Sequence, residues 1–149
     1  RRPSWGTLGR AAAAIVALMT SVMVSYAIIL PALGLDMNAE VTGSITALPL
    51  ALQFALFIRA GVIEEILFRG YPIERLEELT GSQWAAAMIP AVVFIGSHYP
   101  LWGAGQLIVV ALGTMILTLL YMWRRDLVCC MIAHAGTDII GFTLARLQS

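Results

Sequence analysis

The sequence contains little charge, no lysine and only two cysteines. Charged residues make up 12% of its 149 residues, whereas soluble domains carry about 25%. Hydrophobic residues make up 60%, and the mean hydropathy is +0.86. A soluble core of this size could not bury so much apolar surface. The composition therefore excludes an ordinary soluble domain and indicates an integral membrane protein.

The missing lysine and the scarce cysteine exclude further classes. The net charge is zero, and the basic residues are arginines that form no basic stripe, so we expect no nucleic-acid partner. Cys129 and Cys130 are neighbours within an apolar run. This arrangement suits neither a disulfide nor a metal site. We interpret both as small buried hydrophobic side chains.

Five apolar segments are candidates for helices that cross the lipid bilayer. They lie at about 11–33, 43–69, 83–99, 104–123 and 127–145. The predicted fold class is all-α: a polytopic helical transmembrane bundle of about five spans, in a single membrane-embedded domain over 1–149. Because residue 1 is not methionine, we expect the chain to be truncated at its N-terminus.

Proline and glycine mark two boundaries of the second segment. We expect Pro49 to kink it near its start and Gly70-Tyr71-Pro72 to end it. The stretch 73–82 then has apolar residues at helical spacing with charges between them. This pattern is typical of a short amphipathic helix at the membrane interface, and a solvated connecting helix is the alternative.

The distribution of arginine predicts the orientation. Basic residues precede the first segment and lie between the second and third and between the fourth and fifth, whereas 34–42 and 99–103 have none. Because basic loops stay on the cytoplasmic side, we predict a cytoplasmic N-terminus and an external C-terminus. The short loops without lysine favour a prokaryotic plasma membrane. We expect Trp84 and Trp123 to lie at the interface, and Trp102 to do the same.

Six ionisable side chains lie at or near membrane depth. Each costs about 2.5–3.5 kcal/mol there on insertion scales, so such residues usually mark functional sites. They include both histidines of the chain. The six predicted catalytic residues are Glu64, Glu65, Arg69, His98, His134 and Asp138.

The two adjacent glutamates differ in their local partners. Residues four apart share a helix face, so Glu65 can pair with Arg69. Glu64 is turned by about 100° and has no such partner. A carboxylate that is desolvated without a cation is the stronger base, so Glu64 is the better general base and Glu65 the better structural anchor. The alternative is a pair of charges that snorkel to water from a helix end.

His134 and Asp138 lie one helical turn apart in an otherwise apolar segment and therefore share a face. Ala133, Ala135 and Gly136 around them would let another helix or a substrate backbone approach closely. This setting favours a role in the site. A polar pair that satisfies itself and helps helices to pack is the alternative.

The depth expected for His98 conflicts with that of the other residues. At 1.5 Å per residue, Glu64 and His134 lie about 9–10 Å from the expected cytoplasmic helix ends, whereas His98 lies about 21 Å from Trp84. A third span that begins near Pro90, or one that tilts strongly, would remove the conflict. Otherwise His98 is structural and lies outside the site.

Three short motifs occur in order, each on an apolar helix: EExxxR over 64–69, FxxxH over 94–98 and HxxxD over 134–138. Together they resemble the CAAX prenyl protease and bacteriocin-processing family of intramembrane glutamate peptidases, also called the CPBP or Abi family. The resemblance covers about 63–142, which would be the catalytic core. It implies a multi-helix intramembrane endopeptidase.

The resemblance also implies roles for individual residues. Glu64 would activate a water molecule with help from His98, and His134 and Asp138 would face the oxyanion of the tetrahedral intermediate. Many similar proteins have asparagine in place of Asp138. An ionised aspartate only accepts hydrogen bonds, so Asp138 would donate only if protonated. We favour a role in orienting His134 through a ring nitrogen.

The remaining expectations concern ligands and alternative functions. Arg69 would hold Glu65 and the local geometry. We expect no cofactor; zinc is the alternative, because Glu and His can ligate it, although no HExxH pattern is present. The expected partners are the lipid bilayer and a protein or peptide substrate, which could be lipidated. A non-catalytic scaffold or bacteriocin-immunity-type protein that binds a peptide is the alternative function. A proton-coupled transporter is disfavoured by the lack of internal repeats.

Overall fold

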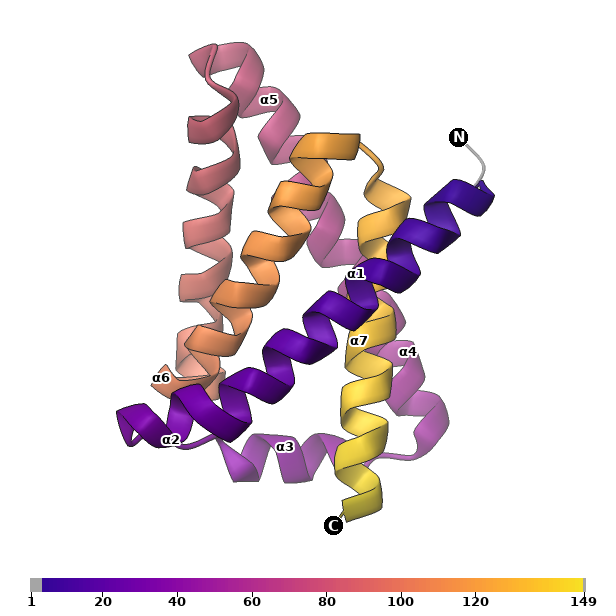
Figure 1. Cartoon of the computed structure of the whole chain (residues 1–149), viewed down its shortest axis with the longest axis vertical. Coiled ribbons are helices and arrows are strands. Elements are labelled where there is room, and N and C mark those ends of the chain that lie inside the picture. Colours follow the sequence, from indigo (N-terminus) through magenta and orange to yellow (C-terminus); the bar gives the residue numbers. More distant parts are fainter. Residues whose placement is uncertain (1–3, 149) are drawn as a thin grey trace.

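The computed structural model describes residues 4–148, and within that range every element of regular secondary structure is a helix (Figure 1). Three helices there are long and apolar enough to cross a membrane: Trp5–Leu33, Gln83–Arg124 and Leu127–Leu147. A bent pair, Ala39–Thr46 with Leu50–Thr80, is a fourth candidate. The predicted all-α helical bundle is confirmed.

The N-terminal part runs the length of the bundle and then crosses its far end. The helix α1 (Trp5–Val24) continues through a π-helical turn, η1 (Ser25–Ile29), into the short α2 (Leu30–Leu33). After the connection at 34–38, α3 (Ala39–Thr46) lies across that end (Figure 1).

The second predicted span differs from the prediction at both ends. Pro49 does not kink a helix but separates α3 from α4 (Leu50–Glu65), at a bend of 118°. Gly70-Tyr71-Pro72 does not end the helix either, because the π-helical turn η2 (Ile66–Gly70) leads directly into α5 (Tyr71–Thr80). The π turn changes the hydrogen-bond register just before Pro72, whose missing N–H is tolerated at the start of a helix. The amphipathic helix predicted over 73–82 is present as α5, but it continues α4 instead of following a break, and its place at the interface stays a prediction.

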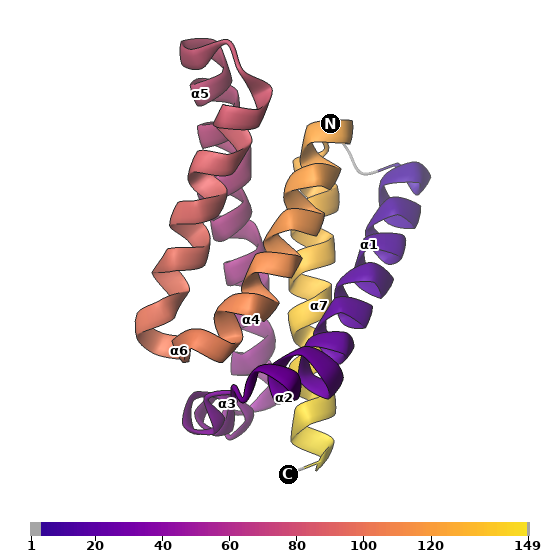
Figure 2. The ribbon, with the colours of Figure 1, turned by 60° about the vertical axis from the view of Figure 1, so that its left-hand side comes forward.

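The helix α6 (Gln83–Arg124) turns back on itself at Gly103, where φ is 74°. Glycine adopts such a positive φ without the steric cost of a side chain. The two legs of α6 run in opposite directions (Figure 2), as the predicted spans 83–99 and 104–123 require. The last helix, α7 (Leu127–Gln148), returns to the end of the bundle that holds α3.

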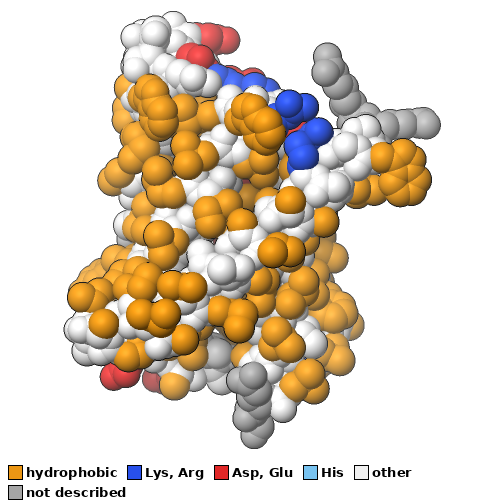
Figure 3. Space-filling model, viewed as in Figure 1, with side chains coloured by type: hydrophobic (Ala, Val, Ile, Leu, Met, Phe, Trp, Pro, Cys, Tyr) orange, Lys and Arg blue, Asp and Glu red, His pale blue; other side chains and the backbone are white. Residues whose placement is uncertain are grey.

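The surface fits a protein surrounded by lipid. Hydrophobic side chains cover the body, and arginines gather at the end that holds the α6–α7 connection (Figure 3). Trp84 and Trp123 are 59% and 71% exposed, at helix ends where interfacial anchors are expected. Trp102, in contrast, packs against Phe142 with ring centroids 6.3 Å apart, so it is not a simple surface anchor.

Small residues set the crossing of α4 and α7. A Cβ atom on Gly61 would lie 2.8 Å from the Cβ of Ala135, and one on Gly136 would lie 2.7 Å from Ile15 of α1. The prediction that small residues around His134 allow close helix approach is therefore confirmed. Both cysteines are fully buried, as predicted. The Gly61–Ala135 contact matters most, because it lies one turn from the polar residues of both helices.

Candidate active site

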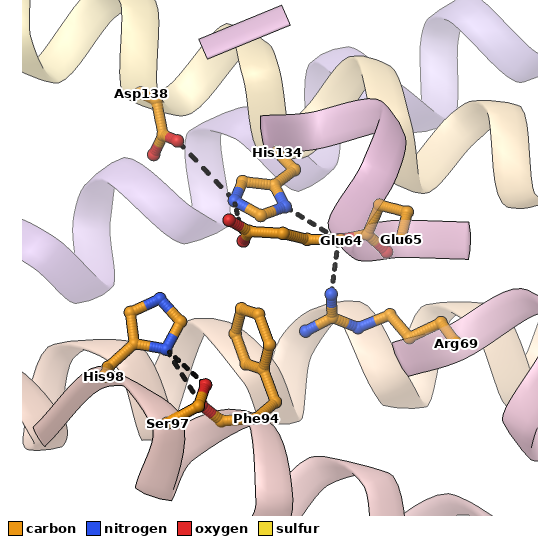
Figure 4. A network of polar contacts seen from close by, with 8 residues as sticks. All are labelled: Glu64, Glu65, Arg69, Phe94, Ser97, His98, His134 and Asp138. Carbon is orange, nitrogen blue, oxygen red and sulfur yellow. Dashed lines mark hydrogen bonds and ion pairs between the residues drawn. The ribbon is translucent and has the colours of Figure 1, made fainter. Parts of the chain in front are cut away.

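Three parts of the fold meet at the predicted polar residues: the end of α4 with η2, the first leg of α6 and the middle of α7 (Figure 4). Five of the six predicted residues contact one another directly, and the sixth, His98, faces them from α6. The five are Glu64, Glu65, Arg69, His134 and Asp138. The structure therefore brings together residues that are up to 74 positions apart in the chain.

Glu65 is the centre of the buried half of this cluster. Its Oε1 atom accepts a hydrogen bond from the Arg69 guanidinium and lies 2.8 Å from Nδ1 of His134. Glu65 and Arg69 are 0% and 1% exposed. A carboxylate is stable at such burial only if it is paired and hydrogen-bonded. The predicted Glu65–Arg69 pair is therefore present. The π-helical turn η2 follows Glu65 directly, and such turns occur often at functional sites.

The other nitrogen of His134 faces two carboxylates. Nε2 lies 3.5 Å from Oδ2 of Asp138 and 3.8 Å from Oε2 of Glu64. Both carboxylate side chains are 31% exposed, so this half of the cluster reaches the surface of the bundle. Because Glu65 accepts the Nδ1–H bond, Nε2 is an acceptor in the neutral ring and a donor in the imidazolium.

Glu65, rather than Asp138, does most to orient the His134 ring. The Nδ1 contact with Glu65 is 2.8 Å, within normal hydrogen-bond range, whereas the Nε2 contact with Asp138 is 3.5 Å. Asp138 also lies beside a ring nitrogen of His134, and its predicted part in orienting that ring stays a prediction. The i, i+4 spacing brought Asp138 near the ring, but the closer partner comes from α4, which spacing along α7 cannot reveal.

His98 faces this cluster from the first leg of α6. Its Nδ1 atom lies 2.8 Å from the backbone oxygen of Phe94 and 3.5 Å from Oγ of Ser97. Its other ring nitrogen points toward Glu64 and Asp138 (Figure 4). Within residues 4–148, no hydrogen bond or ion pair joins His98 directly to these carboxylates.

The predicted conflict over the depth of His98 disappears. Since the helix continues to Thr80, Glu64 lies 16 residues before its end, which is roughly 24 Å. His98 lies 15 residues after the start of α6 at Gln83, which is roughly 22 Å. The α6–α7 connection lies below the α5–α6 turn in Figure 1, so His134 reaches the same level in fewer residues. The conflict arose from the helix end wrongly placed at residue 70.

Two contributors were not among the predicted site residues. Phe94 lies with its ring between Arg69 and His98, and Gly61 lets α7 approach α4. Each stands four residues before a predicted site residue, and this helical spacing is the signal that could have indicated them. Among the residues that the structure describes, no group of three or more His, Cys, Asp or Glu side chains is placed to hold a metal ion.

One comparison with known proteins identifies a family. The model described as type II CAAX prenyl endopeptidase Rce1-like matches residues 46–140, which include all six predicted site residues. No curated protein and no solved structure matches the chain. The match agrees with the resemblance that the three motifs carry.

Proposed function

The chain belongs to the Rce1-like family, and on that premise we propose that it hydrolyses a peptide bond within the membrane, using water activated at Glu64. The family implies an integral membrane protein that acts on a peptide substrate in the bilayer. The proposal assigns the chemistry to Glu64 and His98 and the support of the transition state to His134 and Asp138.

One observation carries this proposal: adjacent glutamates have opposite environments. Glu65 is fully buried and fixed by Arg69 and His134, whereas the Glu64 side chain is 31% exposed and faces the accessible side of the cluster. A general base must reach water and must not be neutralised by a fixed cation. Glu64 reaches the surface and has no arginine partner among the described residues, its nearest ion-pairing nitrogen being Nε2 of His134 at 3.8 Å. Glu65, in contrast, is fully buried and held by Arg69.

The proposed reaction begins with proton transfer from water to Glu64. His98, with its Nδ1–H donated to Phe94, offers the Nε2 lone pair to the same water. The hydroxide oxygen adds to the scissile carbonyl carbon, and the carbonyl oxygen becomes an oxyanion. The C–N bond then breaks, and Glu64 returns the proton to the leaving amine nitrogen.

His134 supports the developing charge. As the imidazolium it donates Nδ1–H to Glu65 and Nε2–H to the oxyanion. Loss of one such donor costs about 10²–10³ in kcat in enzymes where it has been measured. Asp138, beside Nε2, favours the cationic ring by charge; a protonated Asp138 would itself donate to the oxyanion.

The test is cleavage by purified protein in lipid vesicles. The substrates are a farnesylated peptide with a C-terminal tripeptide, its unprenylated form and a library of membrane peptides, and mass spectrometry detects the products. We expect Glu64→Gln to lower kcat by about 10²–10⁴-fold. The control is Glu78→Gln, which makes the same chemical change on α5, where the side chain is 63% exposed.

Three outcomes would contradict the proposal or redirect it. Equal cleavage by Glu64→Gln and the unaltered chain would exclude Glu64 as the base. No cleavage of any substrate by the unaltered chain would favour the non-catalytic scaffold. We expect chelators to leave the rate unchanged, so a loss of activity that zinc restores would replace the proposed mechanism with a metal-dependent one.

A further inference from the structure

We infer that Phe94 is a positioning residue that connects the buried Glu65–Arg69 pair to His98. The inference rests on the proposed function, because it assigns the orientation of one of the proposed reactive groups. Phe94 is 5% exposed and lies on the first leg of α6, between the two groups (Figure 4).

The face of the Phe94 ring contacts the buried cation. Cζ of Arg69 lies 5.1 Å from the ring centroid, within the range of a cation–π interaction, which is stronger where the cation is desolvated. Arg69 is 1% exposed, and its Nε atom has no hydrogen-bond partner among the described residues. The ring thus stabilises the side of the guanidinium that Glu65 does not reach.

The same residue holds His98 in two ways. Its ring meets the imidazole edge-on, with centroids 4.5 Å apart, which is a favourable aromatic geometry. Its backbone oxygen lies 2.8 Å from Nδ1 of His98. A carbonyl only accepts, so the proton lies on Nδ1 and the Nε2 lone pair is left toward Glu64. The ring of Phe94 therefore fixes the plane of the imidazole, and by holding Nδ1 against the backbone oxygen it keeps the ring in one tautomer.

The consequence is that η2 and α6 are coupled through one ring. A shift of Arg69 would move the ring of Phe94, which would move His98 relative to Glu64. Misplacement of a reacting group by about 1 Å can lower a rate by about 10²-fold. A merely structural phenylalanine at this depth would affect stability without this specific effect on turnover.

The first experiment compares turnover by two leucine variants. Phe57 is the control, because it is 4% exposed and pairs with Phe142 at 4.7 Å, and no ring contact or hydrogen bond joins it to the six predicted site residues among the described residues. We expect Phe94→Leu to lower kcat by about 10–100-fold with KM within about threefold. Phe94→Tyr, which keeps a ring, should recover most of that loss. Phe57→Leu should melt at a similarly lowered temperature yet keep kcat within about threefold.

The second experiment observes the histidine tautomer without any activity. The chain has two histidines, so protein labelled with ¹⁵N-histidine gives two imidazole signal sets in NMR, which a His98→Gln variant assigns. We expect His98 to be a single Nδ1–H tautomer in the unaltered chain and in Phe57→Leu. In Phe94→Leu the backbone oxygen remains, but without the aromatic ring the imidazole can rotate away from it, so we expect a mixture of tautomers.

The two experiments distinguish this inference from the proposed function. If the unaltered chain cleaves nothing, the proposed function fails and the NMR result alone decides the inference. An Nε2–H tautomer of His98 in the unaltered chain would overturn it. Equal kcat in the two leucine variants would also overturn it, while leaving the peptidase proposal intact. If Phe94→Leu does not fold, Phe94→Met takes its place in both measurements.

Discussion

Two glutamate–arginine pairs that lie close in the chain have very different environments. Glu65 and Arg69, in the middle of the bundle, have side chains that are 0% and 2% exposed. Arg75 and Glu78, on α5, have side chains that are 58% and 63% exposed. The chemical groups are the same and the helical spacing is similar, but only the first pair is out of water. The contribution of each pair to stability is therefore decided by its burial and not by the presence of opposite charges.

The two pairs are expected to differ greatly in their contribution to the stability of the fold. Exposed pairs contribute about 0–1 kcal/mol, because water screens the charges and both side chains lose freedom. Removing one partner of a buried pair costs about 3–5 kcal/mol, because a desolvated charge is left uncompensated. Glu65 also orients His134. The buried pair therefore supports the site, whereas the exposed pair lies on the surface of α5, without contact to the site among the described residues.

The largest effect is expected when Glu65 is removed from the buried pair. We expect Glu65→Leu to lower the free energy of unfolding by about 3–5 kcal/mol, because it leaves Arg69 buried without its carboxylate. The measurement is unfolding in mixed detergent micelles. The double variant Glu65→Leu/Arg69→Met should recover part of the loss. A single variant within 1 kcal/mol of the unaltered chain would contradict the account.

The second largest effect is expected at Gly61, where α4 and α7 approach each other closely. We expect Gly61→Ala to lower stability by about 1–3 kcal/mol, because its Cβ would meet Ala135 at 2.8 Å. It should also lower kcat, because moving α4 from α7 lengthens the Glu65–His134 contact. Gly96→Ala, where nothing lies within 4 Å of the added Cβ, is the control. A Gly61 variant as active and stable as this control would show that the crossing tolerates separation.

A smaller and pH-dependent effect is expected at the α6–α7 connection. Burial raises the pKa of Asp126, but hydrogen bonds from the Cys129 N–H, Arg10 and Thr7 outweigh it, and the pKa lies below its usual value. A lowered carboxyl pKa stabilises the fold above the unfolded pKa of about 3.9. That contribution is lost as the pH falls through the folded-state pKa.

Asp126→Asn keeps an oxygen that can accept the Cys129 N–H but loses the charge that pairs with Arg10, so it should cost about 0.5–1 kcal/mol at neutral pH and less in acid. Melting of both proteins from pH 7 downward checks this. Curves that stay equally far apart at every pH would show that the Asp126 charge does not contribute.

The smallest effect is expected for the exposed pair. Arg75→Gln should change stability by less than about 0.5 kcal/mol and leave turnover unchanged, and added salt should remove even that difference. The same unfolding measurement applies. A loss comparable to that of Glu65→Leu would erase the distinction between the two pairs.

The sequence predicted the local parts of the site and missed the contacts between helices. The pair of Glu65 with Arg69 and the proximity of Asp138 to His134 follow from one-turn spacing, which any helix imposes. The bond between Glu65 and His134 joins residues 69 positions apart and depends on how closely two helices cross. Side-chain spacing along one helix carries no information about that crossing.

The prediction that the second span ends at residues 70–72 was wrong for a different reason. Proline and glycine usually end helices, and no local pattern announced the π turn that carries α4 into α5. The error also produced the apparent conflict over the depth of His98. The alternating arrangement of the spans agrees with the predicted topology, whereas the cytoplasmic side and the prokaryotic membrane stay predictions.

Glu64 is proposed to act in the chemistry while its neighbour Glu65 holds the fold. Measuring the melting temperature and the cleavage rate on one sample of Glu64→Gln in vesicles separates these two roles. We predict an unchanged melting temperature and a rate lowered by about 10²–10⁴-fold. A retained rate, or a loss of rate that matches a loss of folded protein, would contradict the claim.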